Sequence, residues 1–298
     1  ISREKSSLLI TGGQIGTKGR SILQPGPTPK PMPVTILAPA AAMLYLAATA
    51  LQLLHIFQQR PQINRSFLAL SLAALLCHAG VVWYSVFEGY GVELGFYQVS
   101  ALIFLTINIV CMAALVRRPL QNLLVALFPL SAMAVLVAAY APDTARIRTD
   151  LPAGILLHIG SSILAYAVLT LAAAQAALLA VQDRQLKHRH TRGLVQILPP
   201  LQLMERMLFE LLWVGEILLT VAIGSGFVFL DDIFAQHLVH KTVLTLGSWL
   251  LLAVLLWGHY QLGWRSKTAV RLALSGFALL VLAFFGTKLV LELILGRG

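Results

Sequence analysis

The chain has 298 residues, of which 58% are hydrophobic and only 11% are charged, whereas a soluble globular domain carries about 25% charged residues. This composition excludes an ordinary soluble domain and predicts an all-α, polytopic membrane helix bundle embedded in the lipid bilayer. The formal net charge of +10 does not indicate a nucleic-acid partner, because the Lys and Arg residues lie in short clusters between apolar stretches rather than on one basic face.

Residues 1–31 are polar, rich in Gly, Ser and Pro, and lack the apolar core of a signal peptide. The first apolar run starts just after Met32. We therefore expect 1–31 to be a disordered or non-native N-terminal extension, with Met32 as the natural start. Residues 32–298 are expected to form one eight-span membrane domain.

Eight apolar stretches follow, each near or above the roughly 20 residues that cross a bilayer as a helix. They cover about 34–57, 67–87, 96–116, 121–140, 153–182, 209–229, 242–263 and 270–295. The connection over 183–208 contains Pro199-Pro200, and the apolar residues after this pair predict a short helix lying at the interface before the sixth span.

Basic residues in the loops predict the orientation, because cytoplasmic loops carry the excess of Lys and Arg. One set of loops holds twelve: Arg60, Arg65, Arg117, Arg118, Arg184, Lys187, Arg189, Arg192, Arg206, Arg265, Lys267 and Arg271. The opposite set holds four: Arg146, Arg148, Lys241 and Arg297. We therefore expect the first set in the cytoplasm and both the N-terminus and the C-terminus outside.

Three histidines, His78, His158 and His259, lie inside the apolar stretches. Ionisable side chains at that depth usually mark a ligand, a proton path or a partner, and a neutral imidazole is a common axial ligand of haem iron. For each of the three, a structural hydrogen bond, cofactor ligation and proton transfer all remain open. Loop positions make His188, His190 and His237 more typical of solvated residues.

Helix rise places His158 near the outer end of its span and His259 near the inner end of its own, roughly 20 Å apart along the membrane normal. Two axial ligands of one iron cannot be that far apart, so these two should not share a haem. At matching depth, His55 is the candidate partner of His259, and His237 or His240 that of His158. His78, near the middle, is a midplane ligand or a relay.

Other features bear on alternative functions. Small residues follow His158 on its helix (Gly160, Ser161, Ser162 and Ala165), which leaves room for a planar group or allows helices to pack closely. Glu216 and Lys288 could serve an ion- or proton-coupled transporter, although no pair of Gly/Pro-broken helices supports this. Cys77 and Cys111 have no CxxC spacing and are expected to be packing residues. No motif of a soluble-type enzyme is present, so we do not expect a catalyst.

The second half of the chain resembles the cytochrome c assembly family. The resemblance lies in Leu157–Ser161 with Tyr166, in Leu198–Leu201 and Met204–Arg206, in Leu218–Thr220 and Gly224–Gly226, in Lys241–Thr242 through Trp249 to Gly258–His259, in Gly263–Arg265, in Ser275–Phe277 and in Phe285–Gly286. It covers most of residues 34–295, is strongest after 150, and is closest to the eight-span HemX-like members.

This resemblance implies haem handling in a bacterial inner (cytoplasmic) membrane, with haem b as cofactor, His158 as an outward-facing iron ligand and His259 as the inner one. It also implies a role in cytochrome complex assembly, with cytochrome assembly or respiratory membrane subunits as partners. The chain departs from the family where Leu230–Phe234 replaces a tryptophan-rich outer motif and where no histidine follows the last span. A cofactor-free scaffold or regulatory subunit remains the first alternative, and a transporter the second.

Overall fold

The computed structural model describes residues 32–58, 64–88, 91–141, 147–148, 151–187, 198–229 and 239–286. These residues include eight helical segments long and apolar enough to cross a membrane, as the sequence predicted. They are α1 (Met32–Phe57), α2 (Arg65–Val86), α3 (Phe96–Ala114), α4 (Gln121–Tyr140), α5 (Ala153–Lys187), α7 (Leu201–Phe229), α8 (Val239–Leu262) and α9 (Lys267–Val281), which the π-helical turn η1 (Leu282–Gly286) extends. The predicted extension 1–31 lies outside the described residues.

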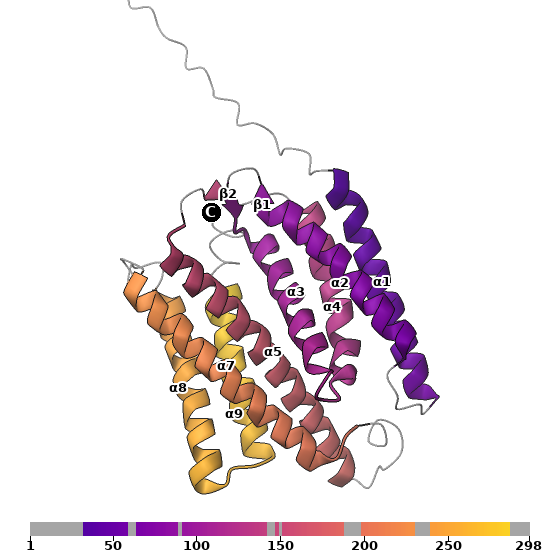
Figure 1. The fold of residues 1–298 in the computed structure, drawn as a ribbon. Coiled ribbons are helices and arrows are strands. Elements are labelled where there is room, and N and C mark those ends of the chain that lie inside the picture. The colour runs from indigo at the N-terminus through magenta and orange to yellow at the C-terminus, as the bar shows by residue number, and fades with distance from the viewer. Residues whose placement is uncertain are drawn as a thin grey trace, which may run out of the picture.

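The helices form two groups that meet at α5 (Figure 1). In the first group α1 packs against α2 and α4, and α3 packs against α2 and α4. In the second, α7 lies along α5, and α8 packs against α7 and α9. Because α5 also contacts α3, α4 and α9, it is the central helix of the bundle. Figure 1 places α1 and α8 on opposite sides of the molecule.

A small antiparallel sheet, which the sequence did not predict, lies at one end of the bundle (Figure 1). Its strands are β1 (Phe87–Glu88), β2 (Gly91–Glu93) and β3 (Ile147–Arg148), with β2 in the centre. Phe87 pairs with Val92 and Val92 with Arg148. The sheet therefore joins the α2–α3 connection to the α4–α5 connection. We call this end the sheet end; α5 and α8 begin there and α7 ends there.

The separate interfacial helix predicted before the sixth span is wrong, because α7 runs without a break from Leu201 to Phe229. Pro199 and Pro200 both precede the first helical residue, where proline costs no helical hydrogen bond. The carbonyl of Pro200 accepts hydrogen bonds from the N–H groups of Leu203 and Met204, which starts the helix. No proline follows within α7 to end or kink it.

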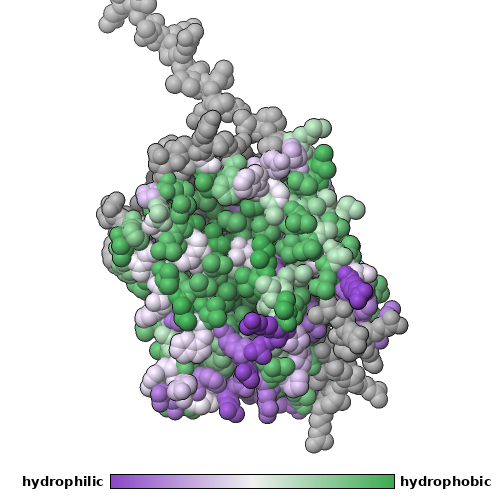
Figure 2. Space-filling view, viewed as in Figure 1, coloured by the Kyte–Doolittle hydropathy of each residue, from purple (hydrophilic) through white to green (hydrophobic). Residues whose placement is uncertain are grey.

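Apolar and polar side chains are distributed over the surface as a lipid bilayer requires. Figure 2 shows hydrophobic side chains over the middle of this face and hydrophilic side chains gathered at its lower end, opposite the sheet. Large apolar side chains such as Met43, Val228 and Leu250 are more than half exposed, which costs little when lipid rather than water surrounds them. The structure thus agrees with a polytopic membrane protein.

Candidate functional site

His158 lies in the first turns of α5, at the sheet end, and its imidazole packs against α7. Its Nδ1 lies 2.7 Å from the carbonyl oxygen of Ala222. A carbonyl can only accept, so Nδ1 carries the hydrogen, and in the neutral ring Nε2 then carries the lone pair. Gly226 makes this approach possible, since a Cβ at that position would lie 3.1 Å from Cε1 and Nδ1 of the ring.

His259 lies near the end of α8, at the end of the bundle opposite the sheet. Its Nδ1 donates to the carbonyl oxygen of Trp264 at 2.8 Å, so its Nε2 also carries the lone pair. The ring stacks on Phe209 of α7, with 3.4 Å between centroids and 15° between planes. Gly258 allows the Trp264 ring to fold back over α8, because a Cβ there would lie 2.3 Å from that ring.

The two Nε2 atoms have no hydrogen-bond partner among the described residues. Both side chains are partly exposed, and neither Nε2 is among the fully enclosed polar atoms without a partner.

The two histidines lie at different depths, as the sequence predicted. His158 binds Ala222 and His259 stacks on Phe209, and these two α7 residues are 13 positions apart. At 1.5 Å per residue this is roughly 20 Å along the helix. One iron cannot bind both imidazoles, so they would serve two sites or two successive positions of one ligand.

His78 has a different environment from the other two. It is fully buried on α2, and its Nδ1 lies 3.1 Å from the hydroxyl of Tyr45 on α1. The Asn108 side-chain amide donates to the Tyr45 hydroxyl (3.3 Å) and to the Ser131 hydroxyl (2.7 Å). Ser131 in turn donates to the carbonyl of Leu127.

The Tyr45 oxygen accepts from Asn108 and keeps a second lone pair and its own hydrogen, so its contact with Nδ1 of His78 forms with either neutral tautomer of the ring. Nε2 of His78 is buried and has no hydrogen-bond partner among the described residues. Tyr45, His78, Asn108 and Ser131 come from α1, α2, α3 and α4, so the geometry favours a structural hydrogen-bonding role for His78.

The structure does not bring the weaker candidates into place as expected. Nε2 of His55 accepts from the Asn64 amide at 3.0 Å, and Asn64 also accepts from the N–H of Ser66 as the N-cap of α2. His55 is on α1 and His259 on α8, on opposite sides of the bundle (Figure 1), so they cannot form one site. His188, His190 and His237 lie outside the described residues.

His240 is exposed in the first turn of α8, at the same end as His158. Its neighbour Lys241 interacts electrostatically with His158 and lies 5.4 Å from the Phe284 ring centroid. Gly160 faces open space, since a Cβ there would meet nothing within 4 Å. Ser161 and Ala165 are buried, so only part of the small-residue group leaves room beside His158.

Glu216 is buried in the middle of α7, and both carboxyl oxygens lack a hydrogen-bond partner among the described residues. Its predicted coupling partner Lys288 lies outside them. The other two glutamates of α7 are partnered: Glu205 accepts from the N–H of Ser266, and Glu210 pairs with Arg118 and Arg206.

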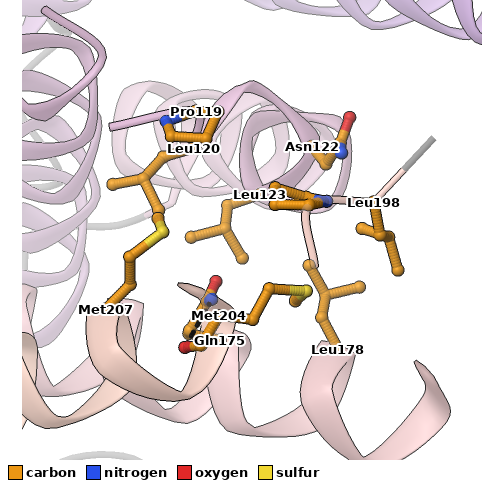
Figure 3. A pocket seen from close by; sticks show the side chains of 10 residues that line it. Pro119, Leu120, Asn122, Leu123, Gln175, Leu178, Leu198, Met204 and Met207 are labelled. Carbon is orange, nitrogen blue, oxygen red and sulfur yellow. Dashed lines mark hydrogen bonds between the residues drawn. The ribbon is translucent and has the colours of Figure 1, made fainter. Parts of the chain in front are cut away.

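A small pocket lies between the start of α4, α5 and the start of α7 (Figure 3). Its volume, ≈ 10 Å³, is about that of the space needed by one water molecule. Leu120, Leu123, Leu178 and Met207 line it, together with the amides of Asn122 and Gln175. It is too small for a porphyrin.

The number of protein ligands that a site needs distinguishes a site for a bare metal ion from a site for haem iron. No group of three or more His, Cys, Asp or Glu side chains that could hold a metal ion occurs in the part of the chain that the structure describes. A bare ion needs about four protein ligands, whereas porphyrin supplies four nitrogens and needs only one or two axial ligands. Two isolated imidazoles with free Nε2 lone pairs therefore fit haem iron.

Sequence reasoning found His158 and His259 but missed the residues that orient them. Ala222 and Trp264 act through backbone carbonyls, and Phe209 through its ring face, so none has a side chain that marks chemistry. Gly226 and Gly258 are the sequence signals for these contacts, because each makes room for an aromatic ring.

Comparisons with known proteins place the chain in a family. The sequence profile of the family described as Cytochrome C assembly protein matches residues 66–295. The chain is 31% identical to Inner membrane protein YpjD of Escherichia coli K12 over 265 residues, which cover 88% of this chain and 100% of YpjD. It is 35% identical over 142 residues, 47% of this chain and 52% of the relative, to an uncharacterized 28.8 kDa protein of Azospirillum brasilense. No solved structure matches the chain.

Proposed function

Because the chain belongs to the cytochrome c assembly family, we propose that it is a multi-pass protein of the bacterial inner membrane that binds or passes haem b and assists cytochrome complex assembly. The observation that carries this proposal is the paired orientation of His158 and His259. In each, a backbone carbonyl fixes the hydrogen on Nδ1 and leaves the lone pair on Nε2, which has no hydrogen-bond partner among the described residues.

Such a contact on the far ring nitrogen is the usual way in which a protein orients an imidazole toward a metal and raises its basicity. When bound, haem supplies the redox chemistry of its iron. The chain's own contribution is to hold the two imidazoles: Gly226 and Ala222 position His158, and Phe209 and Trp264 position His259. Lys241 places a positive charge near His158, which would suit the carboxylates of a porphyrin.

Two sites at different depths suggest that haem moves along the α5, α7 and α8 group, from His259 to His158. The protein acts in this proposal as a haem-handling assembly factor rather than as an enzyme. Its partners would be cytochrome assembly or respiratory membrane subunits.

The test is an absorption spectrum of protein purified from haem-replete membranes in mild detergent. We expect a haem b Soret band that weakens in His158→Ala and in His259→Ala and disappears in the double variant. His78→Ala is the control and should keep the band in whatever protein remains folded. A folded protein without haem in every preparation would contradict the proposal and favour a cofactor-free scaffold.

A further inference from the structure

Glu216 is a buried carboxyl group without a hydrogen-bond partner among the described residues. Neither the packing of α7 nor haem ligation by the two histidines accounts for it. It is 7% exposed, and neither carboxyl oxygen has a hydrogen-bond partner among the described residues. An unpartnered carboxylate in a low-dielectric interior is strongly disfavoured, and ionisable groups within a membrane usually have a function. Glu205 and Glu210 on the same helix are both partnered, so burial without a partner is particular to Glu216.

Glu216 lies on the face of α7 that packs against α8. Phe209, Glu216 and Thr220 are spaced by seven and four residues, close to whole helical turns, so they share one face. Phe209 stacks on His259, and Thr220 accepts from the indole N–H of Trp249 at 2.9 Å. Glu216 therefore lies between two contacts that α7 makes with α8.

Along α7, Glu216 also lies between the two histidine levels. It is seven residues from Phe209, the level of His259, and six from Ala222, the level of His158. These separations correspond to about 10 Å and about 9 Å of helix. A charge at either level interacts with a carboxylate more strongly in a protein interior than it would across the same separation in water.

Among the described helices, α5 and α8 make the main contacts with α7, and none of their ionisable groups bonds to Glu216. On α5 and α8 these groups are His158, Tyr166, Asp183, Arg184, Lys187, His240, Lys241, His259 and Tyr260. Of these groups, His158 and His259 are the two at which a bound haem iron would change the local charge.

We propose that Glu216 is a proton-exchange site coupled to the charge of the haem iron. The empty protein holds Glu216 as the neutral acid. With ferric haem held by His158 or His259, Glu216 would give up its proton to water, leaving a carboxylate that offsets the added positive charge. On one-electron reduction of the bound haem by a donor such as a membrane quinol, Glu216 would take up one proton again, so that electron and proton charges balance.

This inference rests on the proposed function, and a first experiment tests the residue without haem. We expect the infrared spectrum of the empty protein to contain the C=O stretching band of a buried protonated carboxyl group. The band should be absent in Glu216→Gln and present in Glu210→Gln, the matched control on the same helix. An unchanged band in Glu216→Gln would overturn the assignment of the proton to Glu216.

A second experiment tests the coupling in the haem-loaded protein. We expect the midpoint potential of the haem iron to fall as the pH rises, by up to about 59 mV per pH unit, which is the value for one proton taken up per electron. The slope should be lost in Glu216→Gln and kept in Glu210→Gln. If the midpoint potential had the same slope against pH in the wild type and in Glu216→Gln, the coupling would be overturned. The haem absorption band of these proteins would still support the proposed function. Absence of haem from every preparation would overturn both, and the infrared result would still show whether Glu216 carries a proton.

Discussion

At the scale of single residues, hydrogen-bond partners separate three histidines that look alike in the sequence. His158 and His259 donate to backbone carbonyls through Nδ1, whereas Nδ1 of His78 shares a hydrogen bond with the Tyr45 hydroxyl. The carbonyl contacts leave the lone pair of the first two neutral rings on Nε2, and the third ring lies in a buried side-chain network. The depth of these residues could be predicted from helix rise, but the hydrogen-bond partners could not, because each lies outside the helix that carries the histidine.

The Tyr45 hydroxyl is the centre of the buried network in α1–α4. We expect Tyr45→Phe to reduce stability by about 1–3 kcal/mol, the cost of leaving buried polar groups without a partner, since both His78 and Asn108 lose their contact. Thermal unfolding in detergent measures this. Tyr260→Phe is the control, because Tyr260 is 82% exposed. If the folded Tyr45→Phe protein also bound less haem than the wild type, a purely structural role would be contradicted.

Two glycines on α7 give a matched test of the His158 site. A Cβ at Gly226 would lie 3.1 Å from the His158 ring, whereas one at Gly224 would meet nothing within 4 Å. We therefore expect Gly226→Val to displace the imidazole from the Ala222 carbonyl and to weaken haem binding at His158 about tenfold or more. Haem titration of both variants in a His259→Ala background measures the outer site alone, and Gly224→Val should bind as the parent does. Equal affinities would contradict the proposed role of His158.

At the scale of secondary-structure elements, α7 connects the features that carry the proposed function. It provides the carbonyl that holds His158, the ring that stacks on His259, and Glu216 between them. Apolar stretches and the length of a bilayer span predicted all eight membrane helices. They could not predict that α7 begins at Leu201, because an amphipathic first turn followed by an apolar run has the same pattern whether or not the helix breaks between them. The sheet was also unpredictable, since strands of two or three residues have no periodicity.

The connection between α3 and α4 is fastened to α7 by an ion-pair group. Arg118 lies 2.6 Å and Arg206 lies 3.1 Å from the same oxygen of Glu210. All three side chains are partly exposed, so each pair should contribute only about 0.2–1 kcal/mol. We expect Glu210→Gln to lower the unfolding temperature slightly at low salt, and the difference from wild type to shrink at high salt as screening removes the interaction. A difference that does not depend on salt would show that packing, rather than charge, is lost.

At the scale of the whole molecule, the bundle divides its polar residues between its two helix groups. The α1–α4 group encloses a hydrogen-bonded network, whereas the group of α5, α7, α8 and α9 carries His158, His259 and Glu216. With α5 central to both, the first group supports the helices on which the second group presents its open imidazoles.

The orientation of the bundle in the membrane is the last prediction. The loops opposite the sheet end hold the excess of Arg and Lys, which predicts that end to be cytoplasmic and the sheet end external. We expect alkaline phosphatase fused after Phe229 or Gly286, where helices reach the sheet end, to be active, and green fluorescent protein fused there to stay dark. Fusions after Phe57 or Lys187 should show the reverse. His158 would then face the external side and His259 the cytoplasmic side, which is the direction of haem movement proposed above. The opposite reporter pattern would reverse that direction while leaving the two sites in place.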